Sequence, residues 1–152
     1  MRRFLQLGAT VALTAALGGL LPAPAAVAAS RHAERHEMLV RTNGSRDAFG
    51  RSDVSINRHM SRLVKRHSSW MARTGNFQHT ADPAGAYLKG VSWHCWGENI
   101  AVSGGSMRDV EKAFMHSSEH RANILNPCFE HVAIGVVRDG DGVAWVTVFF
   151  YG

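Results

Sequence analysis

The chain has 152 residues, of which 45% are hydrophobic and 19% are charged, and its formal net charge is +5 at pH 7. Without the two arginines of its N-terminal leader, 15 basic residues stand against 12 acidic ones, a net charge of +3. A charge this small, carried by basic residues scattered along the sequence, argues against a nucleic-acid partner, and the length suits one domain with one core.

Residues 1–29 have the pattern of a secretory signal peptide. A basic start, "MRR", leads into the apolar run "LGATVALTAALGGLL" and then into the small residues "PAPAAVAAS". This order favours cleavage after Ala28 or Ala29. A Gly-Gly pair and Pro22 leave the apolar run short of the ~20 residues that a membrane span needs. We therefore expect a secreted, extracellular domain over residues 30–152, with no stable membrane anchor after cleavage.

Two helices are predicted in the first half of this domain. Residues 32–42 form the first. The second is predicted with Asp53 or Ser55 as its N-cap and with its end at Gly75-Asn76. The residues that share its apolar face at helical spacing are Ile56, Met60, Leu63, Val64, His67 and Met71. Its opposite face carries Arg58, Arg62, Lys65, Arg66 and Ser69, which we interpret as a basic, solvated surface.

The second half of the domain begins with a predicted helix and ends with a predicted hairpin. "SMRD" at Ser106 matches a capping box, so a third helix is expected there. "HVAIGVV", the turn "RDGDG" and "VAWVTVFFY" are typical of a β-hairpin. In the last strand both alternating sets of side chains are largely apolar, so both faces should be covered. The pattern predicts an α+β fold, a three-layer α–β–α sandwich around a mainly antiparallel sheet.

The two cysteines, Cys95 and Cys128, both lie in the domain that is expected outside the cell. An isolated pair in an oxidising compartment indicates one disulfide. In the chain-entropy model it would stabilise the fold by roughly 3–4 kcal/mol. Free thiols or zinc ligands are the alternative, and export disfavours them.

The segment "HSSEH", from His116 to His120, matches the zinc-ligand pattern of one metalloprotease class. On one helix the two histidines would face the same metal, with Glu119 as a base. Enzymes of that class are much larger and need a third ligand downstream, whereas only 32 residues follow His120. We therefore expect His116 to be a surface residue and the pattern to be a chance match.

Motifs spread along the chain, taken in order, point to a different family. The motifs are "NGSR", "FQHT", "GENI", "HRANIL" and the final "VAIGVV…WVTVFFYG". In this order they resemble those of the CAP superfamily, the SCP domains of cysteine-rich secretory, antigen 5 and pathogenesis-related 1 proteins, in the form found in secreted bacterial members. The resemblance covers about residues 36–152. Asn43-Gly44 by itself indicates a turn, but the family pattern puts "NGSR" in the first helix.

The resemblance implies an α–β–α sandwich with a cleft in which two histidines often bind a divalent metal, commonly zinc. Carried over by position, His79 and His120 are those histidines and Glu98 is the acid beside them. The family's second glutamate falls on Ser117, so the acidic set is incomplete. His94 and His131 are expected to be exposed. Arg121 and Asn123 are expected to be structural, through a salt bridge and a loop or cap hydrogen bond.

Two functions remain open from the sequence. The first is a binding module without catalysis, because the family includes members that bind lipids and members that act on partner proteins. Its partner would be a lipid or other small hydrophobic ligand, or an extracellular protein. The second is a metal-dependent hydrolase of peptides or cell-wall material, with Glu98 activating a water molecule. The absence of the second glutamate favours the first.

Overall fold

The fold is that of a computed structural model, which describes residues 24–152, with side chains from residue 32 onward. Most of the predicted signal peptide lies outside the described residues, so it stays a prediction. Within the described part no helix is long and apolar enough to span a membrane. The elements, in chain order, are α1 (Pro24–Ala48), β1 (Ser55–Ile56), α2 (Arg58–Thr74), α3 (Pro83–Tyr87), β2 (Trp96–Ser103), α4 (Met107–His116), α5 (Ser118–Ile124), β3 (His131–Arg138) and β4 (Ala144–Tyr151).

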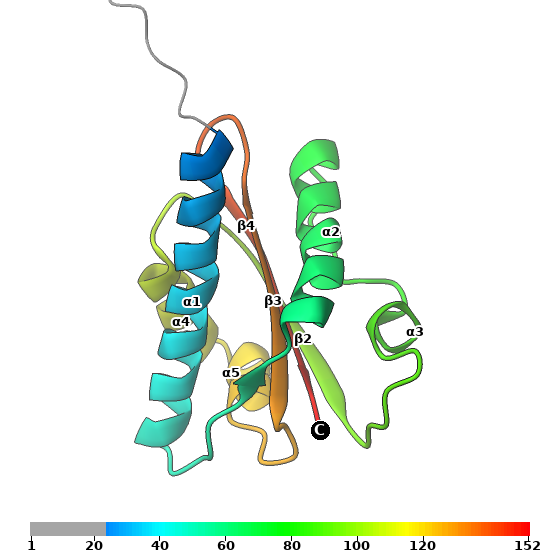
Figure 1. The fold of residues 1–152 in the computed structure, drawn as a ribbon. Helices are drawn as coiled ribbons and strands as arrows, with labels where there is room; N and C mark the ends of the chain where they lie inside the picture. The colour runs from blue at the N-terminus through cyan, green and yellow to red at the C-terminus, as the bar shows by residue number, and fades with distance from the viewer. Residues whose placement is uncertain (1–23) are drawn as a thin grey trace, which may run out of the picture.

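The strands form one sheet in the order β1-β3-β4-β2. β4 pairs antiparallel with both β2 and β3, and the short β1 pairs parallel with β3. Figure 1 shows this sheet nearly edge-on, with α1 and α4 on one side and α2 and α3 on the other. The predicted three-layer α–β–α sandwich with a mainly antiparallel sheet is therefore confirmed.

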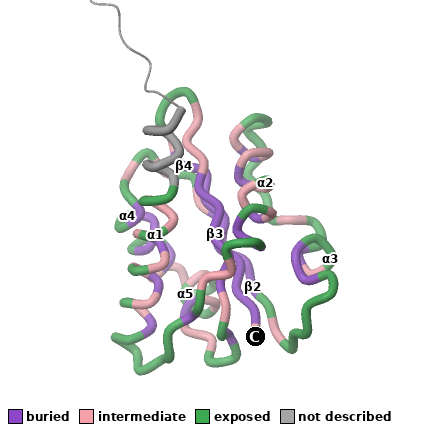
Figure 2. Tube along the Cα trace, viewed as in Figure 1, coloured by how far each residue is buried: buried purple, intermediate pink, exposed green. Residues whose placement is uncertain are grey.

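The core lies on both faces of β4, all eight residues of which are buried (Figure 2). One alternating set packs beneath α1 and α4: Ala144, Val146, Val148 and Phe150. Phe149 and Tyr151, from the other set, pack with residues of α2 and α3. The expectation that the last strand is covered on both faces is confirmed, and it explains why neither set could be polar.

α1 continues through Asn43-Gly44 to Ala48, so the family pattern was right and the local turn signal was wrong. A tertiary contact overrides the local preference. The Asn43 side chain donates to the Val54 carbonyl and accepts from the Val54 amide, at 3.2 and 3.0 Å. These two bonds fix the chain as it leaves α1 and enters β1.

α2 begins at a different cap from the one predicted. Asn57 is its N-cap and accepts from the Met60 amide at 2.9 Å. Asp53 and Ser55 cannot cap it, because Ser55 belongs to β1. The predicted end at Gly75 is confirmed, and this glycine has the left-handed φ of 69° that favours its residue type.

α2 packs very close to the sheet. A Cβ at Gly135 of β3 would lie 2.6 Å from the backbone of Lys65, so only glycine permits this approach. Ser68 of α2 donates to the Gly135 carbonyl at 3.1 Å, and Ser61 accepts from the Ile134 amide at the same distance. α2 therefore satisfies backbone groups of β3 with its own hydroxyls.

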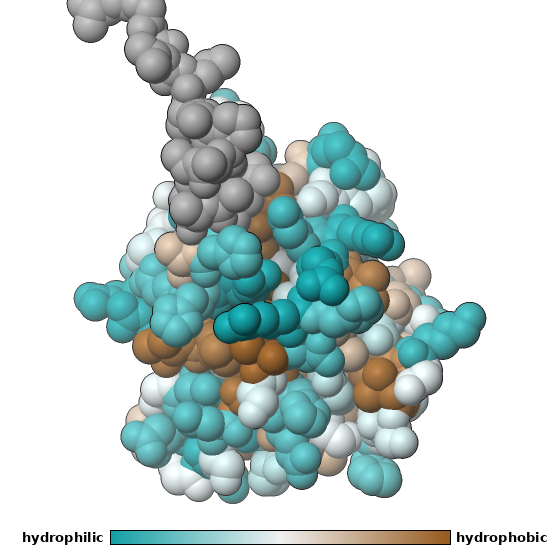
Figure 3. Space-filling model, in the orientation of Figure 1, coloured by the Kyte–Doolittle hydropathy of each residue, from teal (hydrophilic) through white to brown (hydrophobic). Residues whose placement is uncertain are grey.

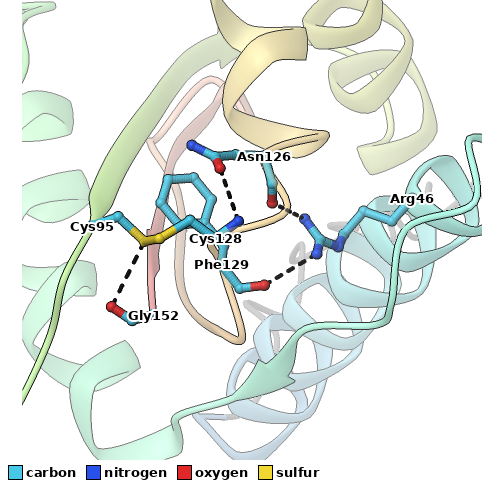
Figure 4. Close-up of a disulfide and its surroundings, with 6 residues drawn as sticks. All are labelled: Arg46, Cys95, Asn126, Cys128, Phe129 and Gly152. Carbon is cyan, nitrogen blue, oxygen red and sulfur yellow. Dashed lines mark hydrogen bonds between the residues drawn. A yellow bond between two sulfur atoms is a disulfide. The ribbon is translucent and has the colours of Figure 1, made fainter.

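The segment between α5 and β3 is held by two independent devices (Figure 4). The predicted disulfide between Cys95 and Cys128 is present. From the other direction the buried Arg46 of α1 donates to the carbonyls of Asn126 and Phe129, at distances of 3.1 Å. The segment therefore joins the end of α1 to the start of β2.

Candidate functional site

The H-x-x-E-H segment is not a single helix. α4 ends at His116, and α5 begins at Ser118. Ser117 between them is extended, with φ −95° and ψ 125°, and caps the end of one helix and the start of the other. His116 is exposed and its Nδ1 lies 2.7 Å from the Lys112 carbonyl. The break removes the i, i+4 relation that a metalloprotease helix needs.

The buried centre of the candidate site is Glu98 on β2, whose side chain is only 2% exposed. Oε1 accepts from His79 Nδ1 and from the Thr80 amide, each at 2.9 Å. Oε2 accepts from the Thr80 hydroxyl at 2.8 Å. Three donors thus satisfy a carboxylate that would otherwise be costly to bury.

Thr80 and Tyr87 complete this network, and motif matching did not single them out. The two hydroxyl oxygens are 2.8 Å apart. Because the single Thr80 hydroxyl proton goes to Glu98, the phenol of Tyr87 must donate to Thr80. Burial raises the pKa of Tyr87 to about 12, so the phenol keeps its proton. Thr80 adjoins His79 in "FQHT", which was the available signal; nothing local pointed to Tyr87.

The backbone of β2 at this point is held by α5. Asn123 donates to the Glu98 carbonyl and to Asn99 Oδ1, at 3.3 and 2.8 Å. Asn99 in turn donates to the His120 carbonyl at 3.0 Å. A Cβ at Gly97 would lie 2.6 Å from Asn123 Oδ1, so the glycine of "GENI" permits the close approach. Asn123 is structural as expected, but its bonds run to a strand rather than to a loop or cap.

His79 is the exposed end of the network, with a side chain that is 56% exposed. It lies in the loop after α2, as the sequence indicated. Since Nδ1 faces Glu98, Nε2 is the ring nitrogen that is left for a ligand. A carboxylate behind the imidazole fixes its orientation and makes it a stronger donor to a metal.

His120 comes from α5 and is half-buried, with its ring 4.9 Å from that of Phe114. Its pKa is lowered by burial, and also by the positive charge of a protonated His79, while Glu119 acts in the opposite direction. The charge of His79 therefore acts on His120 across the site. A neutral imidazole is the form that binds metals.

The donor set limits the kind of metal site that could form. Among the described residues no group of three or more His, Cys, Asp and Glu side chains is arranged to hold an ion. Glu98 is turned toward its three donors, so only the two imidazoles are left as protein ligands. Two imidazoles fit an open site that water or a ligand completes, rather than a catalytic zinc centre with three protein ligands.

The other sequence-predicted residues lie around this centre. His94 is exposed as expected, whereas His131 is half-buried with its ring 4.9 Å from that of Tyr151. Ser117 is half-buried at the junction of α4 and α5 and brings no carboxylate. Arg121 lies over the ring of Phe49 at 4.7 Å, a cation–π contact in place of the expected salt bridge.

Comparisons with known proteins agree with this architecture. A sequence model of CAP, the cysteine-rich secretory protein family, matches residues 39–151. The uncharacterized protein YkwD of Bacillus subtilis is 34% identical over 104 residues, which make up 65% of this chain and 40% of that protein. The chain therefore spans less than half of that relative's length.

Solved structures share the fold at low identity. An extracellular protein containing an SCP domain from Bacillus anthracis has a TM-score of 0.74 at 22% identity, over 88% of this chain and 45% of that one. An outer surface protein of Borrelia burgdorferi has a TM-score of 0.70 at 15% identity, over 78% of this chain and 92% of that one.

Proposed function

This chain belongs to the cysteine-rich secretory protein (CAP) family, and from that premise we propose that it is a secreted binding module without catalytic activity. In this proposal His79 and His120 hold a divalent metal, most simply zinc. The partner is a lipid or other small hydrophobic ligand, or an extracellular protein.

The observation that carries the proposal is that the Glu98 carboxylate is buried and already hydrogen-bonded. A general base must be free to take a proton from water. Both oxygens of Glu98 already accept hydrogen bonds, and its side chain is 2% exposed. By the family resemblance, Ser117 falls where the animal and plant pattern has a second glutamate. The network therefore supports a role for Glu98 in orienting His79 rather than in activating water.

The two imidazoles are suited to a divalent ion. His79 would bind through Nε2, oriented by Glu98, and His120 would bind from α5. A bound ion would supply a Lewis-acidic centre with coordination positions open to oxygen atoms of a ligand.

Exposed apolar side chains that lie near His79 and Glu98 in the sequence support a hydrophobic ligand. Phe77, Trp93 and Trp96 are 54%, 41% and 40% exposed. Phe77 lies two residues before His79, and Trp96 lies two residues before Glu98 on the same face of β2. Large apolar groups gathered at a polar centre are typical of ligand-binding surfaces.

Secretion is supported by three observations. The N-terminal pattern is that of a signal peptide, and the cysteines form a disulfide, which is characteristic of oxidising compartments. The two structural relatives are named as an extracellular and an outer surface protein.

The alternative is a hydrolase, and the geometry favours one version of it. The contact between His79 Nδ1 and Glu98 is the arrangement in which a carboxylate orients a histidine base. His79 Nε2, rather than Glu98, would then take the proton from water. This function would need turnover that disappears in both His79→Ala and Glu98→Ala.

Zinc titration by calorimetry, after removal of bound metal with a chelator, tests the proposal. We expect a single site, and a loss of affinity of more than about tenfold in His79→Ala and in His120→Ala, since each removes one of two protein ligands. His116→Ala is the matched control, because this histidine is exposed on α4 and outside the network. Equal zinc affinity in all four proteins would refute the metal site.

Assays on the same four proteins distinguish a binding module from a hydrolase. Incubation with lipid extracts followed by mass spectrometry identifies retained ligands, and a panel of peptide and cell-wall substrates measures turnover. Turnover by the wild-type protein that is lost in His79→Ala would replace the binding module with the hydrolase.

A further inference from the structure

The outward face of α2 carries the row of positive charges that the sequence pattern predicted. We define the basic stripe as Arg58, Arg62, Lys65, Arg66 and Arg73. These residues recur at helical spacing, so they share one side of α2. The four arginines are exposed and Lys65 is half-buried. The 17 residues of α2 contain no Asp or Glu.

The stripe has no acidic partner. The ion pairs of the described residues join Arg41 to Glu37, His79 to Glu98 and Arg138 to Glu34, and none includes a residue of the stripe. Like charges three and four residues apart destabilise a helix. Arg62 Nη2 lies 2.8 Å from His59 Nδ1, but this contact brings no negative charge, so among the described residues no acidic side chain offsets the repulsion within the stripe.

α1 extends the positive surface across to α2. Arg35 of α1 and Arg58 of α2 line the same hollow. The pKa of Arg35 is lowered by burial and then by the positive charges of Arg58 and Arg62. The hollow has a volume of about 290 Å³ and is lined by His32, Arg35, His36, Leu39, Ile56 and Arg58. Figure 3 shows hydrophilic surface gathered over α2 and the adjoining part of α1.

A second hollow of about 610 Å³ lies farther along α2. Its lining is almost entirely cationic: Arg62, Lys65, Arg66, Ser69 and Arg73. From Arg58 to Arg73 the helix rises by about 22 Å. The positive surface is thus an elongated track, with one hollow beside Arg58 and a second that extends from Arg62 to Arg73.

The stripe is not needed to protect the backbone groups of β3 that face α2. Natural sheets often protect an open edge with charged side chains. Here the backbone groups of Ile134 and Gly135 are already bonded by Ser61 and Ser68 on the inner side of α2. The arginines point away from these contacts into solvent, so they are free to meet a partner.

We propose that the basic stripe, together with Arg35, binds a linear phosphate-bearing polyanion laid along α2. Charge complementarity identifies an anionic partner, and the elongated track identifies a polymer. The predominance of arginine favours phosphate, because the planar guanidinium donates two parallel hydrogen bonds to phosphate oxygens. This surface is separate from His79, Glu98 and His120, and the proposal does not depend on metal binding.

Fluorescence anisotropy with labelled inorganic polyphosphate tests the proposal on the purified protein. The variant Arg62→Gln/Arg66→Gln/Arg73→Gln removes three exposed charges from the stripe. Arg51→Gln/Arg108→Gln/Lys112→Gln is the matched control, because it removes three exposed charges outside α2. We expect the stripe variant to bind at least about tenfold more weakly, and its salt slope to fall by about 2–3.

An equal loss in the two triple variants would overturn the proposal, because net charge alone would then explain binding. Wild-type affinity in the stripe variant would overturn it as well. The variant Arg35→Gln/Arg58→Gln tests the other end of the track and should weaken binding independently. Circular dichroism checks that every variant retains the fold.

Comparison of polyphosphate with three other anionic ligands tests which class of partner the stripe binds. Polyglutamate that binds as tightly as polyphosphate at equal charge would overturn the choice of phosphate. Vesicles of phosphatidylglycerol that bind more tightly per charge would point to a membrane surface and overturn the polymer. Tighter binding to single-stranded oligothymidine would indicate base contacts and would also contradict the proposal.

Discussion

Two buried charges, Arg46 and Glu98, organise polar networks in this molecule, and the networks end in different ways. Arg46 is 1% exposed, and the Glu98 side chain is 2% exposed. Both lie in family motifs, and both make several hydrogen bonds. Burial and motif membership therefore do not tell the two residues apart. They differ in the groups at which their hydrogen-bond networks end.

The Arg46 network is closed. Its guanidinium donates only to backbone carbonyls at distances of 2.7–3.1 Å, those of Ser52, Ile124, Asn126 and Phe129. Ile124 is the last residue of α5, and the other three acceptors lie in connecting segments; Figure 4 shows the bonds to Asn126 and Phe129. Arg46 thus joins the end of α1 to the α5–β3 segment, and no part of the network reaches a ligand.

The Glu98 network is open. It passes through His79, whose ring is more than half exposed and keeps one nitrogen free of the carboxylate. Under the proposed function the two buried charges differ in role, because the hydrogen bonds of Glu98 position a side chain that solvent can reach. A buried charge whose bonds all end on backbone stabilises the fold.

The largest expected effect follows from breaking the closed network. Arg46→Met should destabilise the protein by more than about 3 kcal/mol, because buried carbonyls lose their donors. Urea denaturation measures the change in the free energy of unfolding. Arg51→Met, at a neighbouring exposed arginine, should stay within about 0.5 kcal/mol of the wild type. A loss below about 1 kcal/mol in Arg46→Met would show that the network is dispensable.

The disulfide tests the structural role of the Arg46 network, since it holds the same α5–β3 segment from the opposite direction. Its cysteines are 33 residues apart. Cys95→Ser/Cys128→Ser should therefore lower the free energy of unfolding by roughly 3–4 kcal/mol. Combined with Arg46→Met, the two losses should not add, because both changes release one segment. Strict additivity in urea denaturation would contradict this shared role.

A smaller loss of stability is expected from the open network. Glu98→Gln should lower the free energy of unfolding by about 1–3 kcal/mol. The NH2 group of the glutamine cannot accept a hydrogen bond, so at least one donor that now faces a carboxylate oxygen would lose its acceptor. Zinc affinity should fall by about 10–100-fold, because His79 loses its orienting partner. His79→Ala provides the contrast, with a smaller loss of stability than Glu98→Gln, because Glu98 Oε1 still accepts from the Thr80 amide. Destabilisation by His79→Ala as large as that by Glu98→Gln would mean that the network is structural.

The smallest effect concerns the protonation of His120. Its folded pKa is lowered, first by burial and then by the charge of His79. The unfolded chain, with an ordinary histidine pKa of about 6.5, therefore binds the proton more readily. The stability that His120 contributes is present above about pH 6.5 and is lost as the pH falls toward the folded pKa.

An NMR titration of the His120 ring measures this shift. In His79→Ala the pKa of His120 should rise, because one lowering charge is gone, and should stay below the ordinary value, because burial remains. An unchanged pKa in that variant would mean that the two imidazoles are not neighbours.

Much of the fold could be predicted from local patterns, because the relevant signals lie within a few residues. The capping box at Ser106 is present as expected, with Asp109 as its partner. Gly75 ends α2, and the final hairpin forms where alternating apolar residues placed it. The predictions failed where distant contacts decide. Asn43-Gly44 stays helical because Asn43 bonds Val54, and Asn57 replaces the expected caps because β1 pairs with β3.

The candidate site divides in the same way. The sequence by itself determined the family motifs, the disulfide and the identity of His79, Glu98 and His120, because residue types and their order carry that information. Only the tertiary structure decided what these groups can do. It separated His116 from His120 and gave Glu98 the hydrogen bonds from Thr80 that occupy its oxygens. Hydrogen-bond partners and neighbouring charges depend on which distant segments meet, and that is settled only when the core packs.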